Sequence, residues 1–394
     1  MFFVRPVELR DLDRLLELAH TVHFINLPPH KPTIENKIDR AAASFQRVAA
    51  REIPKTDGER RAGLFFFVLE DPATGICSGT SSIMAGMGGP DHPNLSFQLV
   101  KATRRSVTLD EQTKSTTGEL EHIIACLFQD RASPSELGAI LLPSDLRGGG
   151  YGKLMSWIRL HFIALYPEFF APRILAEMMA PIDKYNDGNL FWRMVPRRFI
   201  NLPYERADRL STRTREFMYR LLPDRFNLSL MPDGVLTSIA AVNEQTKPAE
   251  RMLKDIGFRF THRIDPFDAG PHYEANRDDI SVVKATRRLP LIATDLPDVN
   301  EAPYCIVSHW PEGGQFRAVN AEAIVLDQGV RLTKQAADVL NAKPGAELGI
   351  TPTRLRPVAA PDFPLPEVEM PSMRGLDAVE MARLFAQFHS RDHF

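Results

Sequence analysis

The sequence predicts an α/β (α+β) fold in which helices flank a mixed β-sheet and a small β-rich subdomain follows. Two observations support this fold class. Continuous apolar runs at Leu64–Leu69 and Leu137–Leu142 are typical of strands that are covered on both faces. The strands also form a meander between helical segments, which differs from a regular strand–helix–strand repeat and indicates a sheet of mixed direction.

The composition is that of a globular protein. Apolar residues make up 44% and charged residues 25% of the 394 positions, enough for roughly two to three domains. The formal net charge is −2, so the basic surface of a non-specific nucleic-acid binder is missing and we expect no nucleic-acid partner.

The N-terminus has no targeting pattern, because the apolar run in Met1–Arg5 is too short for a signal peptide. No apolar run approaches a membrane span of roughly 18 residues. We expect a cytoplasmic protein with no membrane partner.

Cysteine usage points to reduced thiols. Cys77, Cys126 and Cys305 lie far apart and form no C-x-x-C pair. Such a pattern favours neither a disulfide framework nor a zinc site. We therefore expect no metal ligands among the cysteines and no structural disulfide.

Apolar spacing defines the elements of the N-terminal half. Offsets of three, four and seven residues predict helices, and continuous or alternating apolar runs predict strands. Thr33 is suited to capping the second helix. In chain order, we expect a strand at Phe2–Val4, helices at Leu12–Val22 and Thr33–Phe45, strands at Leu64–Leu69, Ile76–Ala85, Leu95–Thr108, His122–Phe128 and Leu137–Leu142, a helix through Leu165, and a strand at Arg173–Met178.

The second half begins with helical segments and ends in a β-rich region. Pro248 suits a first helical turn, Gly257 a helix end, and Thr333 the cap of a short helix. Six prolines between Pro352 and Pro371 predict an extended strap. The remaining elements are helical turns over 187–200, a strand from Phe258, strands at Tyr304–Val307, Ala323–Leu326 and Leu348–Ile350, and a short terminal helix at Leu376–Phe388. We expect four parts: 1–200, 201–290, 291–355 and 356–394.

A glycine-rich turn joins the strand at Leu137–Leu142 to the next helix. It reads Arg147-Gly148-Gly149-Gly150-Tyr151-Gly152 and fits the pattern R-x-x-G-x-G. Three consecutive glycines allow successive backbone N–H groups to converge, and the helix N-terminus adds partial positive charge. We therefore expect Arg147, Gly148, Gly149, Gly150 and Gly152 to bind a phosphate or pyrophosphate group.

Several kinds of glycine turn compete with this interpretation. A tight strand-to-helix connection needs no ligand. A Walker loop requires Ser or Thr after its lysine, whereas Leu154 follows Lys153. A dinucleotide fold places its glycines near the first strand, whereas this turn follows a meander. The acyl-coenzyme A (acyl-CoA) loop of GNAT-type N-acyltransferases remains, and the chain resembles those proteins in this turn and in its strand context.

Motifs spread over roughly residues 1 to 350 make the resemblance more specific. Their order and spacing resemble the arginine N-succinyltransferase family. The matching pieces are V-R-P-V-E-x-x-D at Val4–Asp11, Leu27-Pro28, F-V-L-E-D at Phe67–Asp71, S-E-L at Ser135–Leu137, A-E-M at Ala176–Met178, Ile182-Asp183, Phe191-Trp192, Arg198-Phe199, R-A-D at Arg206–Asp208, Q-T-x-P-A at Gln245–Ala249, G-F-R at Gly257–Arg259, I-D-x-F-D-x-G-P at Ile264–Pro271, Leu332-Thr333 and Pro344-Gly345.

The resemblance implies a GNAT-type fold and transfer of a succinyl group from succinyl-CoA to the α-amino group of arginine, in arginine catabolism. Succinyl-CoA, or another acyl-CoA, would be a co-substrate, with no tightly bound cofactor. Ile140 falls where the family binds succinyl-CoA. Pantetheine amides would pair with the strand edge formed by Ile140, Leu141 and Leu142. A homo-oligomer or a paralogous partner subunit is also conceivable for such a chain.

The sequence departs from the family at its proton donor. The family has a His-Pro pair just before Q-T-x-P-A, whereas this chain has Asn243-Glu244. Asn cannot exchange a proton near neutral pH. Glu244 or a nearby histidine, His262 or His272, could substitute. Alternatively, water carries the proton while Asn243 positions the substrate, or the chain is a weakened copy that serves as a non-catalytic CoA-binding subunit or acylates a different amine.

Acidic side chains are candidates for binding the amine substrate. Carboxylates pair with ammonium and guanidinium groups through charge-assisted hydrogen bonds. Glu136 and Glu177 follow from the strand motifs, and Asp265 and Asp268 from the I-D-x-F-D segment. We expect these four residues to bind the amine and guanidinium groups of the substrate, and we expect no metal site.

Overall fold

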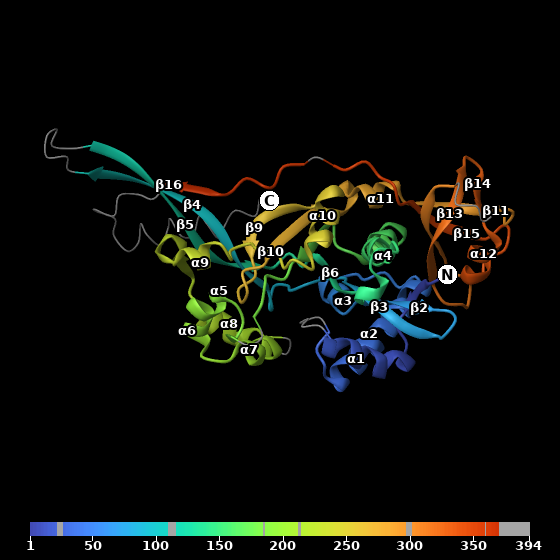
Figure 1. The fold of residues 1–394 in the computed structure, drawn as a ribbon, viewed down its shortest axis with the longest axis horizontal. Helices are drawn as coiled ribbons and strands as arrows, with labels where there is room; N and C mark the ends of the chain where they lie inside the picture. The colour runs from blue at the N-terminus through green and yellow to red at the C-terminus, as the bar shows by residue number, and fades with distance from the viewer. Residues whose placement is uncertain are drawn as a thin grey trace.

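The computed structural model of the protein describes residues 1–21, 27–108, 116–183, 186–211, 214–296, 302–358 and 360–369. Its strands form one extended mixed sheet in the order β12-β15-β11-β14-β13-β1-β2-β3-β6-β7-β10-β9-β4-β5-β8, and β16 pairs with β4. Helices lie on both sides of the central strands (Figure 1). The predicted fold class, a mixed sheet flanked by helices, is confirmed.

The strands extend from the N-terminus to the end of the described chain. Their bounds are β1 Phe3–Pro6, β2 Leu64–Asp71, β3 Ile76–Met84, β4 Asn94–Thr108, β5 Thr116–Asp130, β6 Ser135–Leu141, β7 Arg173–Glu177, β8 Arg225–Asn227, β9 Arg259–Ile264, β10 Pro271–Asn276, β11 Arg287–Ala293, β12 Tyr304–His309, β13 Arg317–Leu326, β14 Gly329–Leu332, β15 Glu347–Pro352 and β16 Glu367–Glu369. The paired strands β4 and β5 form a long hairpin, here called the arm, which projects at one end (Figure 1).

The helices fill the connections between these strands. Their bounds are α1 Leu12–Thr21, α2 Lys31–Ala49, α3 Asp57–Arg61, α4 Tyr151–Leu165, α5 Leu190–Met194, α6 Pro196–Ile200, α7 Tyr204–Ser211, α8 Glu216–Leu221, α9 Asp233–Leu236, α10 Lys247–Asp255, α11 Ser281–Ala285 and α12 Lys334–Leu340, with short 3₁₀ turns between some of them. None of the described helices has both the length and the apolar character needed to cross a membrane.

Most predicted elements are present, with differences that have physical causes. Helix α2 begins at Lys31, two residues before Thr33, with His30 at the N-cap, so the predicted cap at Thr33 is wrong. The strand predicted at His122–Phe128 belongs to the longer β5, because pairing with β4 orders its polar ends. Helices α7, α8 and α9 were not predicted, since they are short and their apolar stripes span only one or two turns.

Other predicted termini are confirmed. Thr333 caps α12 by accepting a hydrogen bond from the Ala336 N–H at 3.2 Å. Gly257 follows α10 with φ of +110°, a left-handed conformation that glycine tolerates. The predicted terminal helix at Leu376–Phe388 lies outside the described residues.

Strand β2 explains the continuous apolar run in the sequence. Alternate side chains of a strand point to opposite faces, and both faces of β2 are covered. One set packs with α1 and α2, and the other packs with α4: Leu64, Phe66 and Val68 on the first face, and Phe65, Phe67 and Leu69 on the second. The central sheet therefore lies between two layers of helices.

The C-terminal strands form a smaller cluster that joins the central sheet through β1. Strands β11 to β15 and helix α12 enclose their own apolar core, and Val4 of β1 pairs with Ala318 of β13. The four-part division at residues 200, 290 and 355 stays a prediction. Strands β9 and β10 lie between β7 and β4, so the first two predicted parts share one sheet.

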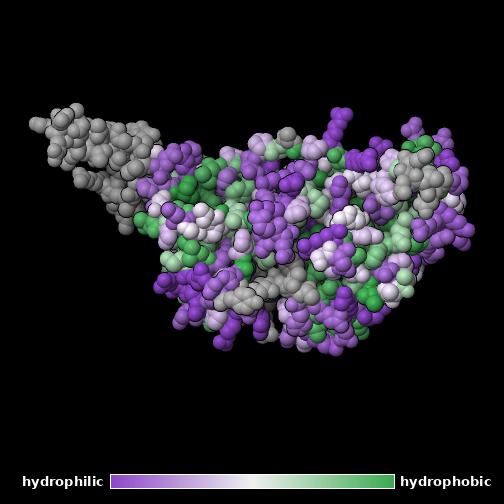
Figure 2. Space-filling model, viewed as in Figure 1, coloured by the Kyte–Doolittle hydropathy of each residue, from purple (hydrophilic) through white to green (hydrophobic). Residues whose placement is uncertain are grey.

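The proline-rich segment is extended, as predicted, over the residues that the structure describes. It leaves the C-terminal cluster and runs back along one margin of the molecule, past α11, α10 and β9, to the arm (Figure 1). The Phe363 N–H donates to the Phe260 carbonyl at 3.1 Å, and Glu367 to Glu369 pair with Lys101 to Thr103 of β4. Figure 2 shows hydrophilic residues over much of this face and hydrophobic residues gathered beside the base of the arm.

A buried histidine links α4 to the C-terminal cluster. His161 is fully buried, and its Nδ1 lies 2.6 Å from Thr351 Oγ1 and its Nε2 2.7 Å from Ser308 Oγ. Burial lowers the pKa of His161 from 6.5 to about 3. The folded protein therefore holds His161 neutral at pH values where the unfolded chain takes up a proton, and stability is lost as the pH falls below about 6.5.

We predict that His161→Gln reduces the acid sensitivity of folding. Between about pH 7.5 and about pH 5, the wild type should lose roughly 2 kcal/mol more unfolding free energy than the variant, because only its unfolded state gains this proton. Urea unfolding at the two pH values measures this difference. Equal losses of unfolding free energy in both proteins would contradict the conclusion that His161 is held neutral in the folded state. This test does not depend on the absolute stability of the variant.

Candidate active site

The predicted glycine turn forms an exposed cradle at the start of α4. Gly148 and Gly150 adopt φ values of +92° and +80°, which L side chains rarely adopt. A Cβ atom at Gly148 would meet nothing within 4 Å, so the space above the turn is open. Among the described residues, no side chain caps α4 and its first turn is free of acidic residues. The N–H groups of this turn can therefore bind an anion.

The strand before the cradle separates from its parallel neighbour. Strands β6 and β7 pair only at Ser135 with Ile174 and at Glu136 with Leu175, as far as the structure describes them. Beyond Glu136, β6 stays paired with β3, where Thr80 opposes Leu141. The β7 side of Ile140, Leu141 and Leu142 is thus an open strand edge, as the predicted pairing with pantetheine requires.

A bulge interrupts β6 where the strands separate. Ala139 has φ of +46°, the register with β3 shifts between Thr80 and Ser82, and the Thr80 hydroxyl donates to the Ala139 carbonyl at 2.8 Å. A bulge redirects backbone groups and bends its strand. Ile140 therefore lies directly after the point at which β6 turns away from β7.

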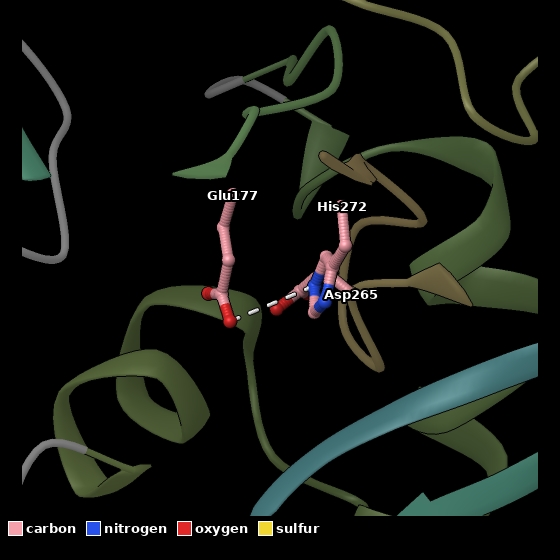
Figure 3. A group of neighbouring side chains, drawn as sticks. All are labelled: Glu177, Asp265 and His272. Carbon is pink, nitrogen blue, oxygen red and sulfur yellow. Dashed lines mark ion pairs between the residues drawn. The ribbon is translucent and has the colours of Figure 1, made fainter. Parts of the chain in front are cut away.

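Three predicted residues meet at the other side of this opening: Glu177 on β7, His272 on β10 and Asp265 directly after β9. Glu177 at the end of β7 lies directly across from His272 of β10. His272 Nε2 is 3.7 Å from Glu177 Oε1, and Asp265 lies beside both (Figure 3). One ligand atom from each of the three residues lies within 4.8 Å of the others. Such a set could hold a cation, either an amine or a metal ion.

Burial sets the charge of this cluster. His272 is only 2% exposed, and burial lowers its pKa to about 4, so it is neutral at pH 7 and can accept a hydrogen bond. Burial also raises the pKa of Glu177, and burial together with the Glu177 charge raises that of Asp265. The Glu177 side chain is 24% exposed to solvent, so a ligand can reach it.

Further polar residues surround the cluster. Asp268 is buried beside Asp265, and burial followed by the Asp265 charge raises its pKa well above the usual range. Its carboxylate accepts the N–H groups of Gly270 at 2.7 Å and Ala180 at 3.2 Å, so Asp268 mainly orders the turn. Glu136 is buried on β6, next to Leu175 of β7.

Two residues that the sequence analysis missed hold Glu177. Asn94 of β4 donates to Glu177 Oε1 at 2.8 Å, and Arg215 beside α8 donates to the Asn94 side-chain carbonyl. The Arg215 charge partly opposes the rise in the pKa of Glu177. Neither residue stands in a recognisable motif, and only the folded sheet brings them to the end of β7.

The residues at the family's proton-donor position lie beside the same strand. The Asn243 N–H donates to the Met179 carbonyl at 3.1 Å, and Asn243 Oδ1 accepts the Gln245 N–H at 3.0 Å. Glu244 is 81% exposed along its side chain and pairs with Lys247. Asn243 thus lies near the opening, whereas Glu244 points to solvent.

The second candidate histidine has a different contact. His262 Nε2 lies 2.7 Å from the carbonyl of Phe363 in the proline-rich strap. Its ring also packs against Phe260, with ring centroids 4.7 Å apart. His262 therefore anchors the strap, and we do not include it among the residues that handle protons.

Comparison with known proteins identifies the family. The model of the family described as arginine N-succinyltransferase beta subunit matches residues 2–282, more than two thirds of the chain. The chain belongs to the arginine N-succinyltransferase family. Arginine N-succinyltransferase from Escherichia coli strain 55989 is 29% identical over 349 residues, which are 88% of this chain and 96% of that relative, and the Shigella flexneri relative gives the same values.

A solved structure supports the family assignment. Arginine/ornithine succinyltransferase subunit AI from Pseudomonas aeruginosa aligns with a TM-score of 0.73 and 26% identity, over 90% of this chain and 99% of that chain. The alignment confirms that this member of the arginine N-succinyltransferase family has the predicted mixed α/β fold.

We predict that Gly150→Val weakens CoA binding by more than about tenfold while the protein still folds. A left-handed valine costs roughly 1–2 kcal/mol and rearranges the turn that presents the N–H groups. The matched control is Gly313→Val in the β12–β13 loop, where φ is +67° and a Cβ atom would meet nothing within 4 Å; at Gly150 it would meet only Asn320 Nδ2 at 3.5 Å, an ordinary van der Waals contact. Calorimetric titration with CoA distinguishes the two. Equal affinity in both variants would refute the cradle.

Proposed function

We propose that this chain transfers a succinyl group from succinyl-CoA to the α-amino group of arginine. Family membership supports the reaction class. The observation that carries the proposal is the opening between β6 and β7, with an anion cradle at one end and partly buried carboxylates at the other. One end suits the pyrophosphate of CoA and the other suits a cationic amine.

The carboxylate cluster is suited to binding a cation. Glu177 and Asp265 are desolvated and repel each other, the neutral His272 supplies no opposing charge, and the charges of Arg215 and Arg263 only partly offset the effect of burial on Glu177. A substrate ammonium or guanidinium group would relieve this repulsion and would form charge-assisted hydrogen bonds. We propose Glu177 and Asp265 as direct contacts, with Glu136 and Asp268 shaping the surroundings.

The acyl transfer follows from this arrangement. The ammonium group gives a proton to the cluster, where the raised pKa makes Glu177 a better base than an ordinary carboxylate and where His272 can accept a hydrogen bond. The free amine attacks the thioester carbonyl, the C–N bond forms and the C–S bond breaks. The Asn243 side-chain N–H group is suited to donating a hydrogen bond to the departing sulfur. The nitrogen loses its second proton as the amide forms, and the sulfur takes up that proton to leave as CoA thiol.

A second candidate function is a CoA-binding subunit without turnover of its own. It rests on Asn243, which stands where the family has the His of its His-Pro pair and cannot exchange a proton near neutral pH. The two functions differ in one respect: the subunit binds CoA, but releases thiol only together with a partner chain.

Release of CoA thiol from succinyl-CoA and arginine tests the proposed activity. We expect release with arginine in the wild type, and a decrease in kcat/KM of about ten- to a hundredfold in Glu177→Gln, because a charged hydrogen bond is lost. The control Glu216→Gln, an exposed residue of α8, should match the wild type. If no thiol is released with arginine, ornithine or other amines, the proposed enzyme activity is rejected. Retained CoA binding would then favour the function as a CoA-binding subunit.

We predict that Asn243→His changes kcat by less than about threefold, because the Glu177 cluster already accepts the proton. Steady-state rates at several pH values measure this. A rise of tenfold or more in the variant would mean that the native site is a weakened form of the family site, and it would favour the subunit function.

A further inference from the structure

Helix α4 carries a buried arginine that stands apart from the other buried arginines. In the described chain three arginines are buried: Arg5, Arg159 and Arg263. Arg5 contacts the carboxylates of Asp11 and Glu70, and Arg263 contacts two carboxylates of its own. Arg159 is 4% exposed, and within the part of the chain that the structure describes its hydrogen bonds all go to neutral oxygen atoms.

The hydrogen bonds of Arg159 leave part of its guanidinium unused. Nε donates to the Ser156 carbonyl at 3.1 Å, Nη2 to Ser156 Oγ at 3.3 Å, and Nη1 to the Gly138 carbonyl at 3.4 Å. A guanidinium has five N–H donors, so one N–H on each Nη remains after these bonds. Two adjacent N–H groups match the two oxygens of a carboxylate.

Charge makes this arrangement costly without an anion. Burial, with no opposing charge, lowers the pKa of Arg159 to about 10, yet the group still carries its charge at pH 7. A buried charge is normally paired, because desolvation is otherwise uncompensated. An anionic ligand that enters beside Gly138 would provide the missing partner.

The location fits the acyl group of the proposed donor. In the proposed pose CoA runs from the cradle along Leu142 to Ile140, so the acyl chain continues toward Gly138. Two residues of strand span about 6.6 Å. The three C–C bonds from a succinyl thioester carbon to its carboxylate carbon span about 4 Å, and one hydrogen bond of about 2.9 Å completes the distance.

We propose that Arg159 binds the distal carboxylate of the acyl group and thereby selects dicarboxylic acyl-CoA donors over uncharged ones. This inference rests on the proposed acyl-CoA function and identifies what would set donor specificity at that site. The guanidinium would donate its two unused N–H groups to the carboxylate oxygens while its bonds to Ser156 and Gly138 keep it in place.

Donor selectivity in Arg159 variants tests the inference. Succinyl-CoA is compared with butyryl-CoA, in which a methyl group replaces the carboxylate, by thiol release and by calorimetric titration without amine. The wild type should prefer succinyl-CoA. In Arg159→Met the preference should fall about ten- to a hundredfold, through weaker use of succinyl-CoA and unchanged or better use of butyryl-CoA. Arg159→Lys should retain part of the preference, since it keeps the charge.

Two controls separate this role from a structural one. Arg288→Met makes the same substitution near the far end of α4, where Arg288 donates to the Leu165 carbonyl, and should leave the donor ratio unchanged. Thermal unfolding identifies variants that fail to fold, and in that case the Lys variant carries the comparison. The inference is overturned if a folded Arg159→Met keeps the wild-type donor ratio, or if the wild type has no preference for succinyl-CoA over butyryl-CoA. Either result leaves the proposed acyl-CoA function standing. Absence of binding to any CoA ester overturns the proposed function as well.

Discussion

The separation of β6 from β7 is the constraint on which the candidate site depends. Two parallel strands that pair at only two positions leave unpaired backbone groups inside a sheet. Unpaired, buried peptide groups are unfavourable unless something else satisfies them. The bulge at Ala139 holds β6 in this divergent path, because the Thr80 hydroxyl fixes the carbonyl that the bulge turns out of the ladder. The opening is thus built into the strand register.

The opening joins two environments of opposite electrostatic character. The N-terminus of α4 presents N–H groups and glycine backbone at the surface, which favours anions. At the end of β7, the paired Glu177 and His272 and the neighbouring Asp265 form a partly desolvated region that favours cations. A reaction between an anionic carrier and a cationic acceptor can use both, because each reactant is attracted to a different end.

Local patterns predicted the parts of this site that lie close together in the sequence. The glycine turn and the strand before it were identifiable because their residues are adjacent. Glu177, Asp265 and His272 were proposed individually, but their contact depends on the antiparallel register of β7 and β10. Asn94, Arg215 and Arg159 were missed, since an ordinary-looking polar residue becomes informative only when its burial and partners are known.

The proline-rich strap has a consequence for how the sheet ends. In the described part of the chain, strand β4 pairs with β9 only at Phe97 and Gln98, so the neighbouring edge of the arm would otherwise present free peptide groups. Strand β16 occupies this edge from Lys101 to Thr103. Uncovered edges are templates for intermolecular pairing. The strap therefore acts as a built-in edge guard, and because it docks on both β9 and β4, this protection against aggregation depends on those two strands being in place.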